Sequence, residues 1–191
     1  MTLENIVKQI KTYYTFSETE LEIIQSKFQY NIFKTKEFIL NKGQVATHIH
    51  FIEVGLVRVF YLKNAKEITT YLSSDNGFVS SYSSFINQKK SYESIQCLES
   101  TETFSISYKD MQELYKIVPQ WQRIGRYLAE QNVICLADRL LSLQSISAKE
   151  KYDNFLKTAP SKIVKRTPLI HVASYLGITP ESLSRLRKLK Y

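Results

Sequence analysis

The first 30 residues or so place apolar side chains at helical spacing. Ser17 and Glu20 have the separation of a capping box, in which a serine side chain and a glutamate side chain bond reciprocally to the backbone of a helix start. Leu21, Ile24 and Phe28 follow as one apolar stripe. This part of the chain therefore predicts amphipathic helix.

From residue 37 to residue 106 the pattern changes to one typical of β-strands. This segment is rich in β-branched and aromatic residues, and Gly43, Gly55 and Gly77 interrupt it. We expect strands at 48–54, 56–62, 67–72, 91–98 and 101–107. Gly55 lies between two of these runs, where a tight turn favours positive φ. Several short strands joined by turns indicate an antiparallel sandwich or roll.

Helical spacing returns at Ser107, which can cap a helix with Asp110 three residues later. Pro119 interrupts that register, and the chain then runs to residue 144 without another proline. Two apolar stripes lie on this long helix. One consists of Trp121, Ile124, Leu128 and Cys135, and the other of Val133, Leu136, Leu140 and Leu143.

Two apolar faces exceed what packing on one sheet requires. We therefore expect one face to cover the β-domain and the other to meet a second copy of the chain. The dimerisation residues that we assign are Trp121, Ile124, Leu128 and Cys135. The alternative is a helix buried within a single domain.

The last 45 residues predict a group of short helices. Ser147 and Glu150 form a second capping box, and the TAPS segment at 158–161 ends the helix that follows. Two Thr-Pro pairs, at 167–168 and 179–180, each place a cap residue before a proline suited to the first helical position. With Gly177 between them, they predict two helices joined by a short turn, which is a helix-turn-helix unit.

Apolar spacing agrees with that unit and divides its second helix into two faces. The residues expected in its small core are Val172, Ala173, Leu176, Ile178, Leu183 and Leu186. With Leu183 inward, Glu181, Ser184, Arg185 and Lys188 point outward. Arginine can donate two hydrogen bonds to guanine and glutamate can accept from cytosine, so base reading is expected of Arg185 and Glu181. Thr167, Thr179 and Ser182 lie near helix starts and suit phosphate oxygens.

Charge supports a polyanionic partner because it is concentrated in the same segment. The formal net charge is +8, and residues 160–191 hold seven Lys and Arg against Glu181 alone. The remaining residues carry 19 Lys and Arg against 17 Asp and Glu. Double-stranded DNA is therefore the expected partner, and a helical hairpin with a merely solvated basic face is the alternative.

The order of these parts resembles the Crp/Fnr family of bacterial transcription regulators. The segment 173–188, ASYLGITPESLSRLRK, resembles that family's helix-turn-helix, and 42–61 resembles the early strands of its cyclic-nucleotide-binding-like roll. The resemblance implies an α+β protein with a jelly-roll-like sensor domain at 1–118, a dimerisation helix at 119–146 and an all-α DNA-binding domain at 147–191. It also implies a homodimer on a two-fold symmetric operator, with RNA polymerase as a further candidate partner.

The segment 76–98 departs from what that resemblance implies for a cyclic nucleotide site. Binders of this fold have a Gly-Glu pair and, after a short helix, an arginine for the cyclic phosphate. Here Ser80 and Ser81 stand at the first position and Ser91 and Tyr92 near the second. A buried phosphate without its arginine is poorly compensated, so we expect no cyclic nucleotide and no other cofactor. These four residues form a candidate pocket for another effector, and the alternative is an inert or protein-responsive cap.

Other functions find less support in the sequence. Cys97 and Cys135 are too few for an iron–sulfur cluster, no metal-ligand spacing occurs, and no catalytic residues can be assigned, so an enzyme is not expected. No apolar run or signal-peptide pattern indicates a membrane or an export route, so we expect a cytoplasmic protein. The chain ends at Tyr191, where the family usually continues into a wing, so the wing is expected to be lacking. Two alternative hypotheses remain. The protein is a ligand- or protein-binding module with a vestigial DNA-binding tail, or its tail binds anionic membranes.

Overall fold

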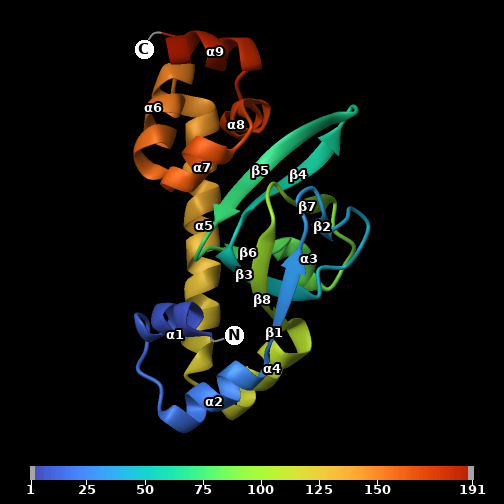
Figure 1. Ribbon diagram of the computed structural model, residues 1–191, viewed down its shortest axis with the longest axis vertical. Coiled ribbons are helices and arrows are strands. Elements are labelled where there is room, and N and C mark those ends of the chain that lie inside the picture. The colour runs from blue at the N-terminus through green and yellow to red at the C-terminus, as the bar shows by residue number, and fades with distance from the viewer. Residues whose placement is uncertain (1–2, 189–191) are drawn as a thin grey trace.

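The computed structural model describes residues 3–188, and it shows an elongated molecule built along one long helix. In Figure 1 the β-roll lies beside the middle of this helix and a group of short helices lies at its C-terminal end. The helices before the long one are α1 (Glu4–Lys11), α2 (Glu18–Ser26), α3 (Tyr82–Asn87) and α4 (Tyr108–Ile117). The others are α5 (Trp121–Ser145), α6 (Ala148–Thr158), α7 (Ser161–Arg166), α8 (Leu169–Leu176) and α9 (Pro180–Lys188).

Two four-stranded antiparallel sheets form the roll, as the strand pattern predicted. The strands are β1 (Phe28–Phe33), β2 (Phe38–Leu40), β3 (His48–Val54), β4 (Leu56–Lys63), β5 (Lys66–Ser74), β6 (Phe78–Val79), β7 (Glu93–Cys97) and β8 (Thr101–Ser107). One sheet has the order β1-β8-β3-β6 and the other β2-β7-β4-β5. The predicted α+β class, with a jelly-roll-like domain and flanking helices, is confirmed.

Three strands, β1, β2 and β6, were not predicted. One of them, β1, begins where the apolar stripe had predicted helix. The capping box at Ser17 and Glu20 is present, but helix α2 ends at Ser26, and Phe28 begins β1 instead of extending the stripe. Strand β1 pairs along its whole length with β8, from Phe28 opposite Ile106 to Phe33 opposite Thr101. Because β8 lies 70 residues or so later in the chain, helical spacing around Phe28 could not reveal this pairing.

The turn between β3 and β4 requires glycine, as predicted. Gly55 has φ +147°, and its N–H donates to Asp75 Oδ1 at 2.7 Å. A Cβ atom at this position would lie 2.5 Å from Thr101 Oγ1. Any other residue would therefore be strained in its backbone and would also collide with β8.

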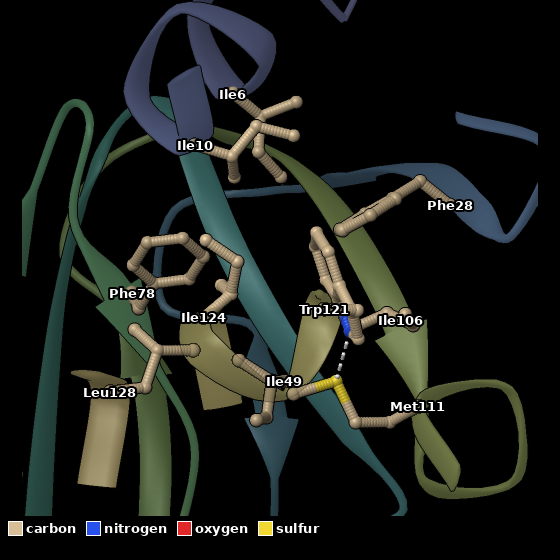
Figure 2. Close-up of a pocket in the computed structure, with 10 residues that line it drawn as sticks. All are labelled: Ile6, Ile10, Phe28, Ile49, Phe78, Ile106, Met111, Trp121, Ile124 and Leu128. Carbon is tan, nitrogen blue, oxygen red and sulfur yellow. Dashed lines mark hydrogen bonds between the residues drawn. The ribbon is translucent and has the colours of Figure 1, made fainter. Parts of the chain in front are cut away.

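The N-terminal end of α5 closes the bottom of the roll. Trp121 and Ile124 are 2% and 1% exposed, and Figure 2 shows them among apolar side chains of α1, α4 and the four-stranded sheet β1-β8-β3-β6. Trp121 Nε1 lies 3.1 Å from Met111 Sδ, its hydrogen-bond acceptor. The cavity between these side chains is only about 10 Å³, so it leaves no space for an effector.

The capping predictions at Ser107 and Ser147 also fit the structure. Ser107 accepts a hydrogen bond from the Asp110 N–H at the start of α4, and Ser147 and Glu150 form a reciprocal capping box at the start of α6. Within residues 3–188, no helix is both long and apolar enough to cross a membrane.

Candidate nucleic-acid interface and effector cleft

Helices α8 and α9 form the predicted helix-turn-helix unit around a small core of their own. Gly177 ends α8 in the left-handed conformation, with φ +65°. Ala173 and Leu183 are completely buried where the two helices meet, together with Tyr152 and Phe155 of α6. The expected core residues Val172 and Leu176 are buried as well, and Ile178 and Leu186 are partly buried.

The start of α9 is capped, which fixes the orientation of its first turn. The Ser182 N–H donates to Thr179 Oγ1 at 3.1 Å, so Thr179 has the cap role that the Thr-Pro pair predicted. Glu181 is exposed, and hydrogen bonds from its own backbone N–H and from Thr179 lower its pKa. Its carboxylate is therefore ionised at neutral pH and is available as an acceptor.

Most of the residues expected to touch DNA lie on one exposed face of α9. Leu183 points inward, and the residues on the opposite side that are exposed are Glu181, Ser184, Arg185 and Lys188. Thr179 is exposed at the helix start and Ser182 is half-buried. The basic charges of the segment are therefore presented on the face that the apolar residues do not use.

Thr167 is a correction to the expected set. It is 5% exposed, and α8 begins after it, with Pro168 as the N-cap residue and no side-chain cap. Its hydroxyl oxygen is buried without a hydrogen-bond partner among the described residues. Thr167 therefore cannot meet a phosphate at the surface, because its side chain is turned into the interior while Pro168 beside it is exposed.

The face of α5 expected to dimerise is also corrected. Trp121 and Ile124 are buried in the core of the roll, Leu128 packs against that core, and Cys135 is half-buried. The exposed apolar residues of this helix belong mainly to the second stripe, and their exposed fractions are 64% for Val133, 57% for Leu136, 58% for Leu140 and 42% for Leu143. The roll covers the stripe that was assigned to a second copy and leaves the other stripe exposed, because the sequence could not show which one the roll covers.

A cluster around Arg58 joins the roll to the helix-turn-helix unit. Arg58 is 4% exposed on β4 and forms an ion pair with Glu67, whose Oε2 lies 2.6 Å from Nη2. Its guanidinium also donates to Gln96 Oε1, and Nη1 donates to Nδ1 of His171 on α8 at 2.9 Å. Burial, and then the charge of Arg58, lower the pKa of His171, so its imidazole is neutral and can accept this bond.

Two further sets of contacts join the same parts. The Thr69 N–H of β5 donates to Ser174 Oγ of α8, which in turn donates to the Glu67 carbonyl. Lys162 of α7 lies 2.5 Å from Asp75 and 2.7 Å from Glu99, and Arg166 lies 3.0 Å from Glu99. Figure 1 shows the β4–β5 hairpin reaching α8. The helix-turn-helix unit is thus bonded to the roll of the same chain.

These joining residues were not predicted, although one signal was present. Arg58 interrupts the run LVRVFYL, and a single charge in a buried strand requires a partner. Nothing in the sequence indicated that Arg58 and His171, 113 residues apart, would meet.

A cleft of about 450 Å³ lies between the roll and α5, and two of the four predicted effector residues line it. Ser80 and Tyr92 belong to its wall, and Tyr92 is 58% exposed. Ser81 and Ser91 are correctly placed beside this wall but are 0% and 3% exposed, so they cannot contact a ligand directly.

The buried serines instead support the side chain of Glu93, which does line the cleft. Ser91 Oγ donates to Ser81 Oγ at 2.8 Å, and Ser81 Oγ donates to Glu93 Oε2 at 3.0 Å. The Glu93 N–H donates back to Ser91 Oγ at 3.0 Å, which closes a ring of hydrogen bonds. Thr70 Oγ1 lies 3.1 Å from the other carboxylate oxygen. Glu93 was not predicted, because the cassette pattern, which is the Gly-Glu pair and the later arginine expected within 76–98, places the serines and Tyr92 at its key positions.

Neither cysteine has the surroundings of a reactive or metal-binding thiol. Cys97 is buried, and burial raises its pKa to about 11; burial also raises the pKa of Cys135. Among the residues that the structure describes, no group of three or more His, Cys, Asp or Glu is placed to hold a metal ion.

Comparison with known proteins agrees with this arrangement. The model of the cyclic nucleotide-binding domain matches residues 31–117. FixK2 from Bradyrhizobium japonicum superimposes with a TM-score of 0.74 at 15% identity, over 85% of this chain and 83% of that one. The chain has the fold of the Crp/Fnr regulators. A protein from Eubacterium rectale assigned to the Crp/Fnr family superimposes with a TM-score of 0.68 at 15% identity, over 91% of this chain and 83% of that one.

Another structure with the Crp/Fnr fold matches almost end to end. The c-di-GMP responsive global regulator CLP of Xanthomonas campestris gives a TM-score of 0.70 at 17% identity, over 91% of this chain and 92% of that one. No curated protein sequence matches the chain. The structural similarity therefore establishes the Crp/Fnr fold. The family model identifies the match of residues 31–117 to the cyclic nucleotide-binding domain. The expected lack of a wing falls on the end of the chain, which lies outside the described residues.

Proposed function

We propose that this protein is a sequence-specific DNA-binding transcription regulator that acts as a homodimer in the cytoplasm. The observation that carries the proposal is the exposed face of α9, with Glu181, Ser184, Arg185 and Lys188 opposite the buried Leu183. A helix placed in the major groove reads bases from its N-terminal part, where Glu181 and Arg185 lie. The capped start at Thr179 supplies a hydroxyl near the phosphate backbone.

The second copy is supported by the exposed second stripe of α5. Val133, Leu136, Leu140 and Leu143 follow one another at intervals of three and four residues, which is the spacing of a two-helix seam. A monomeric protein rarely leaves such a continuous row of aliphatic side chains in water. Pairing of two α5 helices would cover the row and would present two α9 helices to a two-fold symmetric operator. A contact with RNA polymerase belongs to the same proposal.

Selection of bound duplexes from a random DNA pool tests the proposal. We expect an inverted repeat to be recovered. Arg185→Ala should weaken binding to the selected site by about 1–3 kcal/mol and relax the preference at one base of each half-site. Arg126→Ala is the matched control, because Arg126 is an exposed arginine on α5 whose partner is Glu130.

The outcome that would contradict the proposal is equal binding of the wild type and Arg185→Ala to all sequences. That result would favour the alternative, a ligand- or protein-binding module whose DNA-binding unit is vestigial. Binding to anionic vesicles that is abolished by Arg185→Ala, with no duplex recovered, would favour the membrane hypothesis.

A further inference from the structure

The cleft between the roll and α5 combines an aromatic wall with one carboxylate. Its aromatic side chains are Tyr71, Phe78, Tyr82, Tyr92 and Tyr127, and the carboxylate is that of Glu93. Its volume of about 450 Å³ is within the range of small-molecule sites. These residues come from strands β5, β6 and β7, from α3, from the position just before β7 and from α5, so a ligand bound here would touch the roll and the long helix together.

Glu93 is held in place but is not neutralised. Its carboxylate accepts hydrogen bonds from the hydroxyls of Ser81 and Thr70, and Ser91 supports Ser81 from behind. Among residues 3–188, no lysine, arginine or histidine nitrogen forms an ion pair with it. The negative charge of Glu93 is the largest cause of the raised pKa of the neighbouring Tyr92 phenol. The local field at this wall is therefore negative.

The basic side chains near the cleft are turned elsewhere. Arg139 is at the cleft rim, but its guanidinium donates to the Thr69 carbonyl at 2.9 Å and stacks on the Tyr175 ring at 4.7 Å. Neither Thr69 nor Tyr175 lines the cleft. Lys89 and Lys90, which precede the wall in sequence, are exposed and do not line it either.

We propose that this cleft binds a cationic amine, with Glu93 as the counter-ion and the surrounding tyrosines stacked on the cationic group, and that it excludes anionic cyclic nucleotides. An ammonium group gains from a carboxylate through a charge-assisted hydrogen bond and from aromatic faces through cation–π attraction. A cyclic phosphate in the same place would bring a second negative charge beside Glu93, while the guanidinium of Arg139 is engaged by the Thr69 carbonyl and the Tyr175 ring. This inference rests on the proposed function only in treating the occupant as an effector.

Thermal unfolding of the full chain with matched pairs of aromatic ligands tests the inference. The probes are tryptamine and phenethylamine, their acidic counterparts indole-3-propionate and 3-phenylpropionate, and cyclic AMP. We expect the two amines to raise the Tm with increasing concentration, and the acids and cyclic AMP to leave it unchanged. Glu93→Gln should weaken tryptamine binding by about tenfold or more, because it removes the charge and keeps the shape.

Two variants serve as controls. Glu102→Gln changes a carboxylate of the roll that accepts from Tyr30 and does not line the cleft, so amine binding should persist. Tyr92→Ala truncates an exposed side chain and should also weaken amine binding, which keeps the test available if Glu93→Gln does not fold. Stabilisation by cyclic AMP or by the acids, no stabilisation by either amine, or unchanged tryptamine binding by Glu93→Gln and Tyr92→Ala would overturn the inference.

The measurement is separable from the test of DNA binding. Tryptamine binding is measured without DNA, and duplex selection is carried out without amine. A protein that binds DNA but no amine refutes only the cleft chemistry, and a protein that binds tryptamine but no specific duplex refutes only the regulator.

Discussion

The two ends of helix α5 have similar apolar content and opposite surroundings. At the N-terminal end, Trp121 and Ile124 are almost completely buried in the core of the roll. At the C-terminal end, Val133, Leu136 and Leu140 are more than half exposed. The helix is continuous between them. The first end therefore stabilises one folded domain, and the second end is free to stabilise an assembly.

This contrast shows what an apolar stripe can and cannot reveal. The spacing of apolar residues fixes which side chains share a face of a helix. It does not fix which folded element lies opposite that face, because that depends on contacts distant in sequence. The unexpected burial of the first stripe follows directly from this limit.

The largest effect is expected at the buried end. Trp121→Ala removes a buried side chain that packs against Phe16, against Phe28 of β1 and against Met111 of α4, and it should lower the free energy of unfolding by about 3–5 kcal/mol. Urea unfolding followed by circular dichroism measures this loss. Gln122→Ala, at the exposed neighbouring position, should change the stability by no more than about 0.5 kcal/mol. Similar losses for both variants would contradict the contrast.

Substitutions at the exposed end of α5 should change the oligomeric state instead of the stability of the fold. Leu136→Glu combined with Leu140→Glu places two charges in the proposed seam, so the mass in analytical ultracentrifugation should fall from dimer to monomer. Affinity for the selected duplex should fall by about a hundredfold or more, because the two half-sites are no longer bound together.

The matched control for this pair is Gln122→Glu with Gln144→Glu, which adds the same charge at exposed polar positions of α5. This control should remain dimeric. A dimeric Leu136→Glu/Leu140→Glu variant would show that the seam lies elsewhere.

A smaller effect distinguishes packing from helix propensity at the buried end. At an exposed position inside a helix, replacing glycine with alanine stabilises the helix by about 1 kcal/mol. At Gly125, however, a Cβ atom would lie 2.0 Å from Tyr115 Oη and 2.7 Å from its Cζ. Overpacking of this kind costs about 1–3 kcal/mol, so Gly125→Ala should destabilise the protein in urea unfolding.

Tyr115→Phe is the second half of that experiment. It removes the closest atom, so the loss caused by Gly125→Ala should be smaller in the Tyr115→Phe background. An equal loss in both backgrounds would place the cause of destabilisation elsewhere.

The smallest effect concerns the hydrogen bond between Arg58 of the roll and His171 of α8. Burial lowers the pKa of His171, and the positive charge of Arg58 lowers it further. The unfolded chain therefore binds a proton at His171 more readily than the folded chain does. The stability from this contact is present above the ordinary histidine pKa and is lost as the pH falls through the lowered folded value.

His171→Asn measures that contribution, because asparagine can still offer Arg58 an uncharged acceptor. Below a pH of about 6.5, stability in urea should fall less steeply for this variant than for the wild type. Since His48 and His50 also have lowered pKa values, both proteins should lose some stability. Identical pH profiles would show that His171 does not contribute.

Local features of the fold and site were predictable from sequence, and contacts across the fold were not. Caps at Ser17 and Ser147, the turn at Gly55 and the inward position of Leu183 each depend on neighbours in the chain. The pairing of β1 with β8 and the burial of Thr167 depend on distant segments, and both were missed.

The candidate cleft shows the same division. Ser80 and Tyr92 were assigned to it from the cassette pattern, and they line it. Glu93 was overlooked, although it is the next residue after Tyr92. Its importance comes from the hydroxyls of Ser81 and Thr70, which hold it, and from the basic groups that do not reach it.

The buried Arg58 has a consequence for how this sequence can diverge. Its charge is compensated by Glu67 and Gln96 of the roll and by His171 of the helix-turn-helix unit. Loss of Glu67 would leave a buried charge without its counter-ion, and loss of Gln96 or His171 would leave buried N–H groups of Arg58 without an acceptor, which proteins rarely tolerate. Among descendants of this sequence, substitutions at these four positions should therefore occur together, so that the two domains co-evolve through this contact.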